Sequence, residues 1–199
     1  LLAAQEQIWK NTVERKIYVT GGFGHNLYNE GFAPDHYLPN DGAYNETCAA
    51  CAMAFWTLRL ANLKGDGRYT DVLERVLYNG FLSGRSLDGR RLYYNNFMSR
   101  RSPKARFGIA CCASNIVRTI PSVPGYFYAA RATDSLWVHL YAAGEANISW
   151  GGGTLRVVQQ TEYPWNGAVR LTITPPGAGE WTLNLRVPEW AAGATASVN

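Results

Sequence analysis

Hydrophobic and polar residues change their spacing near residue 134 of the chain. Before that point, apolar residues recur every three or four positions, as on one face of a helix. After it, they alternate with polar residues, as in a half-buried strand. Helices are predicted at residues 5–15, 45–63, 70–77 and 115–120, the last three with Asn45, Thr70 and Ser114 as their N-caps. Strands are predicted at residues 137–141, 154–161, 169–174 and 181–187. The pattern indicates a mainly α part, residues 1–131, followed by the start of a β-sandwich, residues 132–199.

The segment between the first two predicted helices, residues 17–45, has no clear period and is rich in Gly, Asn, Asp, Pro and aromatic residues. It is too long for a plain connector, and loops of that kind often carry function. A short hairpin is expected over residues 82–95, with Asp88-Gly89 as its turn. Pro121 and Pro124 are expected to interrupt the chain after the last predicted helix.

Composition excludes several classes of function. The chain has 199 residues, of which 47% are hydrophobic, so a sizeable core can form. Its net charge of +4 is scattered, and no basic run is interleaved with aromatics, so no nucleic-acid partner is expected. No stretch is long and apolar enough to cross a bilayer, so no membrane partner is expected. Because the chain begins without Met and ends within a strand-like pattern, we interpret it as an internal fragment of a longer protein.

The four cysteines of the chain are Cys48, Cys51, Cys111 and Cys112. Adjacent cysteines such as the last two are too close for a relaxed disulfide, so a metal site or a reactive thiol is favoured. Glu46 and Cys48 lie two residues apart at a predicted helix start, and Cys111 and Cys112 lie just before another. Thiolates are soft ligands that favour zinc, and one carboxylate can complete a tetrahedron. We therefore expect Glu46, Cys48, Cys111 and Cys112 to hold Zn²⁺.

Three alternatives remain open on these residues alone. Cys48-x-x-Cys51 together with Cys111 and Cys112 would form a purely structural four-cysteine zinc site, although Cys51 falls on the apolar face of its predicted helix. All four cysteines could instead be small buried apolar residues. A thiol redox protein is the third alternative, and it would need a reversible disulfide that adjacent cysteines form poorly.

Six stretches carry a resemblance to a known family: YVTGGFG (residues 18–24), NEGF (29–32), YLPND (37–41), YNETCA (44–49), LERVLYNG (73–80) and GIACC (108–112). Over about residues 18–141 the chain resembles glycoside hydrolase family 127, the β-L-arabinofuranosidases, and close relatives such as family 146. The resemblance implies that residues 1–131 are the C-terminal portion of an (α/α)6 barrel, which β-sandwich domains follow.

The resemblance also implies roles for individual residues. Cys111 matches the residue that both touches zinc and attacks the anomeric carbon, and Glu30 matches the acid/base. The other zinc ligands match Glu46, Cys48 and Cys112, and the substrate-contacting positions match Glu74 and Tyr94. The implied activity is that of a retaining glycoside hydrolase, which releases β-L-arabinofuranosyl or a related sugar from plant-type glycans. An oligosaccharide or glycan is therefore the expected partner.

The implied chemistry is consistent with general principles. Ordinary retaining glycosidases use a carboxylate nucleophile, and a cysteine can replace it if its thiol is ionised. Free cysteine has a pKa of about 8.5, and zinc coordination deprotonates a thiol outright. Glu30 would protonate the departing oxygen and then, as a carboxylate, activate water. A non-catalytic carbohydrate-binding or scaffold protein with a structural zinc is the alternative, for which Glu30 would be dispensable. Reactive thiolates favour a reducing compartment such as the cytoplasm.

Overall fold

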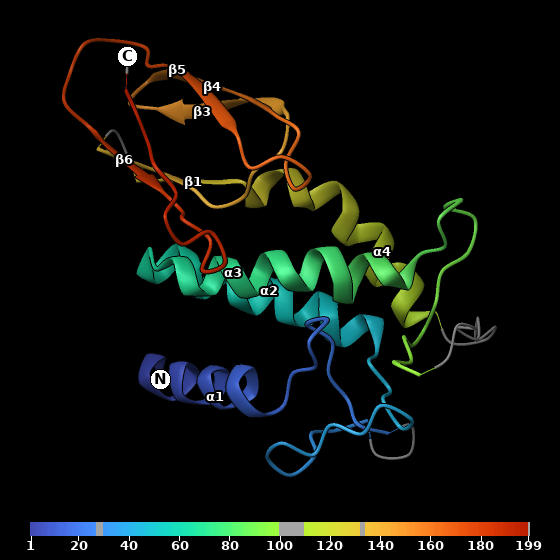
Figure 1. The fold of residues 1–199 in the computed structure, drawn as a ribbon. Helices are drawn as coiled ribbons and strands as arrows, with labels where there is room; N and C mark the ends of the chain where they lie inside the picture. The colour runs from blue at the N-terminus through green and yellow to red at the C-terminus, as the bar shows by residue number, and fades with distance from the viewer. Residues whose placement is uncertain (27–29, 100–109, 132–133, 199) are drawn as a thin grey trace. The chain divides into compact units, whose positions relative to one another are not determined.

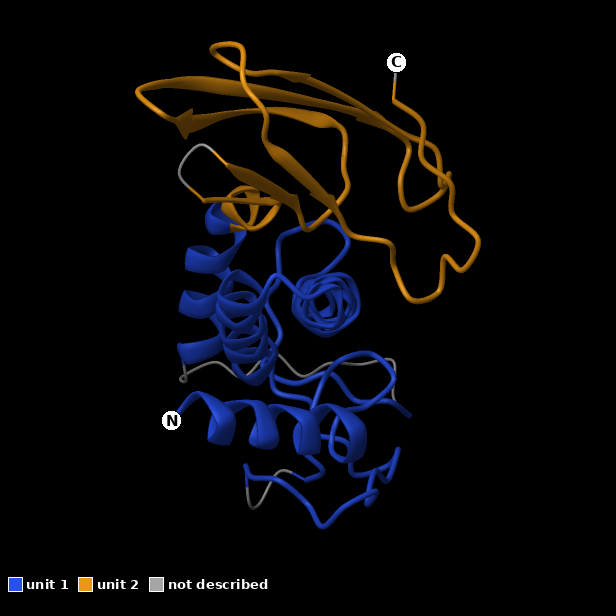
Figure 2. Cartoon of the chain, turned by 90° about the vertical axis from the view of Figure 1, so that its left-hand side faces the viewer, with its two compact units in different colours: residues 1–122 blue, residues 123–199 orange. Residues whose placement is uncertain are grey.

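The computed structural model describes residues 1–26, 30–99, 110–131 and 134–198 (Figure 1). The chain divides into two compact units, residues 1–122 and residues 123–199 (Figure 2). Residues 123–131, which the sequence pattern assigns to the helical part, belong to the second of these units. The predicted boundary itself falls beside residues 132–133, which lie outside the described residues.

Unit 1 is helical. Its elements are α1 (Leu2–Arg15), α2 (Thr47–Lys64), α3 (Gly67–Arg75), the π-helical turn η1 (Val76–Phe81), the short 3-10 turn η2 (Leu82–Gly84) and α4 (Cys111–Thr119). A 3-10 segment, η3 (Ile120–Tyr126), follows α4 and contains Pro124, in agreement with the expected interruption. The third predicted helix, residues 70–77, therefore ends later than predicted, because the helical backbone continues through η1 to Phe81.

Helix α2 is the central element of unit 1 and contacts α3, α4 and η1 (Figure 1). Its mostly apolar sequence buries Met53, Ala54 and Leu60 almost completely. The helix ends at Gly65, whose left-handed φ of 66° allows its N–H to reach Ala61 O at 2.7 Å. At its middle, Thr57 Oγ1 accepts a buried hydrogen bond of 3.0 Å from Trp9 Nε1, which fixes α1 against α2.

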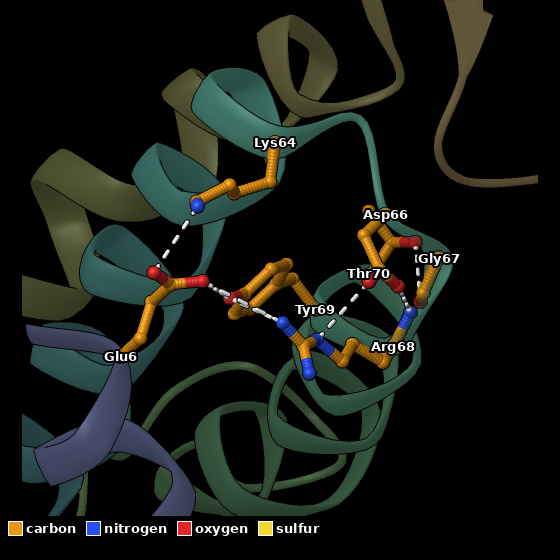
Figure 3. A network of polar contacts seen from close by, with 7 residues as sticks. All are labelled: Glu6, Lys64, Asp66, Gly67, Arg68, Tyr69 and Thr70. Atoms are coloured by element: carbon orange, nitrogen blue, oxygen red, sulfur yellow. Dashed lines mark hydrogen bonds and ion pairs between the residues drawn. The ribbon is translucent and has the colours of Figure 1, made fainter. Parts of the chain in front are cut away.

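A network of polar side chains also joins α1 to the junction of α2 and α3 (Figure 3). Glu6 forms an ion pair of 3.1 Å with Lys64, and its other carboxylate oxygen accepts a hydrogen bond of 3.2 Å from Tyr69 Oη. The hydrogen bond from Lys64 is the main reason that the pKa of Glu6 is lowered. Arg68 contacts the same carboxylate at 3.6 Å. These groups are partly exposed, so each ion pair contributes little to stability, and the network mainly fixes the position of α1.

The three predicted N-caps are wrong. Asn45 has a left-handed φ of 41°, and α2 begins after Glu46. Helix α3 starts before Thr70, and its cap is Asp66, whose carboxylate accepts from Arg68 N at 3.0 Å. Helix α4 starts at Cys111, so Ser114 lies inside it.

Physical reasons account for these differences. The Ser114 hydroxyl donates to Cys111 O at 2.9 Å, three residues earlier, and this local bond is compatible with a helix interior. Asn tolerates the left-handed region better than most residues, so Asn45 serves as a turn residue before α2. The turn at Asn45 depends on a hydrogen bond to a distant part of the chain, from Asn96 N to Asn45 O, which single-residue preferences do not contain.

Unit 2 contains two small sheets. The first has the order β1-β2-β6, formed by β1 (Tyr128–Arg131), β2 (Ser135–Val138) and β6 (Thr182–Leu185). The second has the order β3-β4-β5, formed by β3 (Gly144–Trp150), β4 (Gly153–Thr161) and β5 (Val169–Thr174). Strands β2 and β6 are parallel, whereas the other paired neighbours are antiparallel. A shared hydrophobic cluster, Leu136, Trp150, Leu155 and Val157, joins residues of both sheets.

The strand predictions are most accurate where apolar and polar residues alternate clearly. Strand β5 has the predicted bounds, and β4 begins one residue earlier than predicted. Strand β2 was predicted too late, at residues 137–141, and β6 is shorter than the predicted residues 181–187. Strands β1 and β3 were not predicted, because their sequences, YAAR and GEANISW, contain few β-branched residues. The hairpin predicted over residues 82–95 is reduced to one bridge, between Arg85 and Leu92. None of the described helices combines the length and the hydropathy needed to cross a bilayer.

Candidate functional site

Two segments distant in the sequence, residues 44–47 and residues 93–96, pair with each other at the start of α2. Glu46 and Asn95 form an antiparallel bridge, and Thr47 N donates to Tyr94 O at 2.9 Å. The Thr47 hydroxyl adds a bond of 2.8 Å to Tyr93 O. Asn96 N donates to Asn45 O at 3.2 Å, which holds the left-handed Asn45 in place. The first turn of α2 is therefore fixed from outside the helix.

The four predicted ligands converge on one point. One carboxylate oxygen of Glu46 and the sulfurs of Cys48, Cys111 and Cys112 all lie within 4.8 Å of one another. The sulfurs of Cys48 and Cys112 are 3.2 Å apart. Glu46 Oε1 lies 3.6 Å from Cys112 Sγ and 3.9 Å from Cys111 Sγ. The expectation that Cys111 and Cys112 precede a helix is corrected, because they form its first turn.

This group of four has the composition of a metal site. Three sulfurs and one carboxylate oxygen provide four donors, the number that a tetrahedral ion such as zinc uses. Cys112 is buried and the other three residues are half-buried, so an ion here would be largely shielded from water. The donors come from the first turns of two different helices, α2 and α4, apart from Glu46, which directly precedes α2. The group could therefore hold a metal ion.

Burial favours the neutral form of these thiols. It raises the pKa of the Cys48 thiol to about 12, and a hydrogen bond of 3.1 Å from Asn115 Nδ2 acts in the opposite direction. Burial also raises the pKa of the Cys112 thiol, and the hydrogen bond with Cys48 raises it further. A nearby cation would reverse this preference, because it stabilises the thiolate. The donor set thus fits a divalent ion that binds thiolates.

Cys51 does not belong to this group. It lies in the middle of the buried face of α2 and is almost completely buried. Burial raises the pKa of its thiol, as expected for a cysteine in an apolar environment. The geometry therefore does not support the four-cysteine alternative, in which Cys51 replaces Glu46.

Glu30 lies in the long loop between α1 and α2, and its carboxylate is bound by two tyrosines. Tyr44 Oη donates to Glu30 Oε1 at 3.0 Å, and Tyr94 Oη donates to the same oxygen at 3.4 Å. The backbone of Glu30 has a φ of 45°, an uncommon conformation for a residue other than glycine. Such strained residues cluster at functional sites, where surrounding structure holds them.

The same two tyrosines belong to the thiol cluster. Tyr44, Tyr94 and Cys112 form a buried cluster against which Cys48 and Cys111 pack. Burial, the carboxylate of Glu46 and a hydrogen bond with Cys111 together raise the pKa of Tyr94 to about 12. The Tyr94 hydroxyl thus lies beside both the Glu30 carboxylate and the Cys111 sulfur. One side chain therefore connects the predicted acid/base with the predicted nucleophile.

One further predicted residue lies outside the group of four possible ligands, and two residues of the site were not predicted. Glu74 lies on α3 and is buried, but it is outside the group of four possible ligands. Tyr44 and Asn115 were not predicted as site residues. Tyr44 stands in the YNETCA stretch, two positions before Glu46, so its place in the motif was the available signal. Parts of two motifs, residue 29 of NEGF and residues 108–109 of GIACC, lie outside the described residues.

Two family models match the chain. The model described as "Beta-L-arabinofuranosidase, GH127 catalytic domain" matches residues 1–125. The model described as "Beta-L-arabinofuranosidase, GH127 middle domain" matches residues 135–199. Each match covers most of one of the two compact units, residues 1–122 and residues 123–199.

Individual proteins agree with these matches. A non-reducing end beta-L-arabinofuranosidase of Bifidobacterium longum subsp. longum is 36% identical over 218 residues, which include 100% of this chain and 33% of that protein. The solved structure of a GH127 beta-arabinofuranosidase has a TM-score of 0.89 at 46% identity, over 95% of this chain and 30% of that one. A GH127 beta-L-arabinofuranosidase from Geobacillus stearothermophilus T6 has a TM-score of 0.83 at 42% identity, over 92% and 31%. The chain therefore spans about a third of the length of these relatives.

Proposed function

The chain belongs to the GH127 β-L-arabinofuranosidase family, and from this premise we propose that it is part of a retaining glycoside hydrolase with a cysteine nucleophile. The observation that carries the proposal is the convergence of four donor atoms from Glu46, Cys48, Cys111 and Cys112 within 4.8 Å. Glu30 is connected to this group through Tyr94, so the proposed acid/base and the proposed nucleophile, Cys111, both contact one tyrosine.

We propose zinc as the metal, with the same four residues as its ligands. When bound, the ion would keep the Cys111 sulfur in its thiolate form and fix its direction. Three sulfur ligands favour a soft ion over magnesium or calcium, which prefer oxygen. Asn115 supports this arrangement by donating a hydrogen bond of 3.1 Å to the Cys48 sulfur.

The reaction proceeds in two displacements at the anomeric carbon. Cys111 Sγ forms a bond to that carbon while the bond to the leaving oxygen breaks, and Glu30 gives its proton to that oxygen. Glu30, now a carboxylate, takes a proton from water as the water oxygen attacks the same carbon. The bond to Cys111 breaks and its thiolate returns. Because the carbon is inverted twice, the product keeps the configuration of the substrate.

The substrate we propose is a terminal β-L-arabinofuranosyl unit, or a related sugar, of a plant-type glycan. The B. longum relative is named as acting at a non-reducing end, which supports a terminal sugar. We assign Glu74 and Tyr94 to substrate contacts, and the burial of Glu74 on α3 is compatible with a role inside a closed site. We further propose that residues 1–131 form the C-terminal part of an (α/α)6 barrel and that residues 132–199 begin a β-sandwich.

The proposal is tested with the complete zinc-loaded protein and an aryl β-L-arabinofuranoside. Cys111→Ser should lower turnover by roughly three or more orders of magnitude while leaving the circular dichroism spectrum unchanged. Cys51→Ala, a change at a cysteine outside the group of four, is the matched control and should keep most of the activity.

A second experiment detects the covalent intermediate. Glu30→Gln slows the release of the sugar, so an activated substrate should leave one pentosyl unit on the peptide that contains Cys111, seen by mass spectrometry. An active Cys111→Ser protein, or a pentosyl unit on another residue, would contradict the assignment. An undiminished Glu30→Gln protein would favour a non-catalytic role for the site.

A further inference from the structure

We propose that Tyr44, assisted by Tyr94, is a positioning residue that holds Glu30 through one carboxylate oxygen, Oε1, and thereby selects Oε2 as the oxygen that transfers the proton. This inference rests on the proposed function, in which Glu30 is the acid/base. It goes further by assigning a role to Tyr44 and by distinguishing the two oxygens of one carboxylate.

The geometry of the two hydrogen bonds is the first argument. Both hydroxyls donate to Oε1, Tyr44 at 3.0 Å and Tyr94 at 3.4 Å. Among the described residues, no donor to Glu30 Oε2 is found. A carboxylate oxygen that accepts two hydrogen bonds is poorly placed to carry a proton as well, because its lone pairs are already used. The proton for the leaving group therefore resides on Oε2.

The position of Glu30 on the loop is the second argument. Glu30 lies outside any helix or strand and is exposed, so no regular element of the backbone fixes its side chain. Tyr44 and Tyr94 are only 1% and 6% exposed, and their rings pack with a centroid separation of 5.9 Å. Fixing a flexible side chain in a productive geometry before reaction lowers the barrier. The two tyrosines provide that constraint.

The connection to the thiol cluster is the third argument. Tyr94 O accepts from Thr47 N at 2.9 Å and lies 3.5 Å from Cys112 Sγ, so the backbone of Tyr94 is part of the scaffold that carries the four predicted ligands. Tyr44 is also bound to the loop, since its N–H donates to Gly24 O at 2.8 Å. Glu30 thus takes its position from the same scaffold as Cys111. The separation between the acid/base and the nucleophile, which a retaining mechanism requires to be short, follows from these contacts.

The test compares substrates whose leaving groups need acid assistance to different degrees. The zinc-loaded complete protein and its Tyr44→Phe variant are assayed on 4-nitrophenyl and 4-methoxyphenyl β-L-arabinofuranosides. The nitrophenolate leaves with little help from an acid, whereas the methoxyphenolate requires protonation. Loss of a hydrogen bond to a carboxylate predicts a drop of about 10- to 100-fold in kcat/KM for the methoxyphenyl substrate. For the nitrophenyl substrate the drop should be less than about 3-fold.

Tyr18→Phe is the matched control. Tyr18 is a buried tyrosine of the same loop, but its hydroxyl donates to Pro39 O at 3.0 Å rather than to Glu30. Removal of the Tyr18 hydroxyl should leave the ratio of kcat/KM between the two substrates unchanged. Zinc content and circular dichroism establish that each variant is folded. If Tyr44→Phe does not fold, Tyr94→Phe is compared by the ratio of kcat/KM between the two substrates, because Tyr94 is also assigned a substrate contact that affects both; the change should be smaller because its bond to Glu30 is longer.

The outcomes separate the inference from the proposed function. The positioning role would be overturned if a folded Tyr44→Phe protein lost kcat/KM equally on both substrates, or lost none on either. If Glu30→Gln abolishes activity on the methoxyphenyl substrate while Tyr44→Phe shows no selective loss, only the positioning role fails. If Glu30→Gln retains full activity on both substrates, the acid/base assignment fails, and the positioning role fails with it.

Discussion

The sulfur atoms of Cys48 and Cys112 lie 3.2 Å apart, although the two residues are 64 positions apart in the sequence. Each belongs to the first turn of its helix, so the N-terminal ends of α2 and α4 meet at this point. Two thiolates this close would repel each other strongly in a half-buried environment. Burial raises the pKa of both thiols, so without a cation they stay protonated. A bound divalent ion would remove the repulsion and connect the two helices.

Removal of the metal should therefore lower stability. We expect one zinc per chain, measured by elemental analysis, and a melting temperature that falls by several degrees after treatment with a chelator. Binding at a free-ion concentration of 1,000 times Kd stabilises the folded state by about 4 kcal/mol, which sets the scale of the change. Zinc added back should restore the original melting temperature.

Two cysteine variants sharpen this experiment. Cys112→Ala removes one of the four predicted ligands, so this protein should contain little zinc and show no further loss of stability with chelator. Cys51→Ala should contain the full amount of zinc, because Cys51 lies outside the group. A Cys51→Ala protein without zinc, beside a Cys112→Ala protein with zinc, would contradict the ligand assignment.

A second prediction concerns Gly84, which lies against the start of α2. A Cβ atom at Gly84 would stand 2.5 Å from Thr47 Cγ2 and 2.8 Å from Thr47 Oγ1. Thr47 is fixed by its hydrogen bond to Tyr93 O, so it cannot move without disturbing Glu46 and Cys48 on either side. Gly84→Ala should destabilise the protein by about 1–3 kcal/mol and weaken zinc binding.

The control for this prediction is Gly125→Ala. Among the described residues, no atom beyond the adjoining chain lies within 4 Å of the position that a Cβ atom would take at Gly125, so the added methyl group meets open space. Melting temperature and zinc affinity are measured for both variants. Equal melting temperatures would show that the start of α2 adjusts more readily than the close contact with Thr47 indicates.

Residue types and their spacing in the sequence were sufficient to predict some parts of this site but not others. Cysteine is rare in this chain and Glu46 stands two positions before Cys48, so the four predicted ligands could be grouped from the sequence, and the structure brings those four together. The start of α2 could not be predicted, because the left-handed conformation of Asn45 depends on hydrogen bonding to Asn96. The contact between Tyr44 and Glu30 was missed for a similar reason. Nothing in a tyrosine's identity indicates which carboxylate its hydroxyl will reach.

A third prediction concerns the buried hydrogen bond between α1 and α2. Trp9 Nε1 donates to Thr57 Oγ1 at 3.0 Å, and both residues are buried. Thr57→Val keeps the shape of the side chain but leaves the indole N–H without an acceptor, which costs about 1–3 kcal/mol. The free energy of unfolding, measured by urea denaturation, should fall by that amount.

Thr12→Val is the control for this prediction. Thr12 is also buried, but its hydroxyl donates to Ile8 O, a carbonyl of its own helix, so its removal strands no donor. The double variant Trp9→Phe/Thr57→Val should lose less stability than the two single changes together, because neither partner is then left unpaired. Additive losses would mean that the hydrogen bond contributes nothing beyond packing.

The last prediction is a pH dependence that His139 introduces into unit 2. Burial lowers the pKa of His139 to about 4, and the charge of Arg186 adds to this effect. An unfolded chain returns the imidazole to its ordinary pKa of about 6.5, so between these values the unfolded state binds more protons than the folded one. Stability is therefore complete above about pH 6.5 and falls as the pH drops toward 4, by roughly 2 kcal/mol at pH 5 from this residue.

The measurement is urea unfolding at pH 5.0 and pH 7.5 for the wild-type protein and His139→Gln. Any packing cost of the substitution is present at both pH values and cancels in the difference between them. The variant should lose roughly 2 kcal/mol less than the wild type on acidification, because glutamine has no proton to gain. If both proteins lose the same amount, other groups cause the acid sensitivity, and His139 is protonated in the folded state more readily than its burial and the charge of Arg186 indicate.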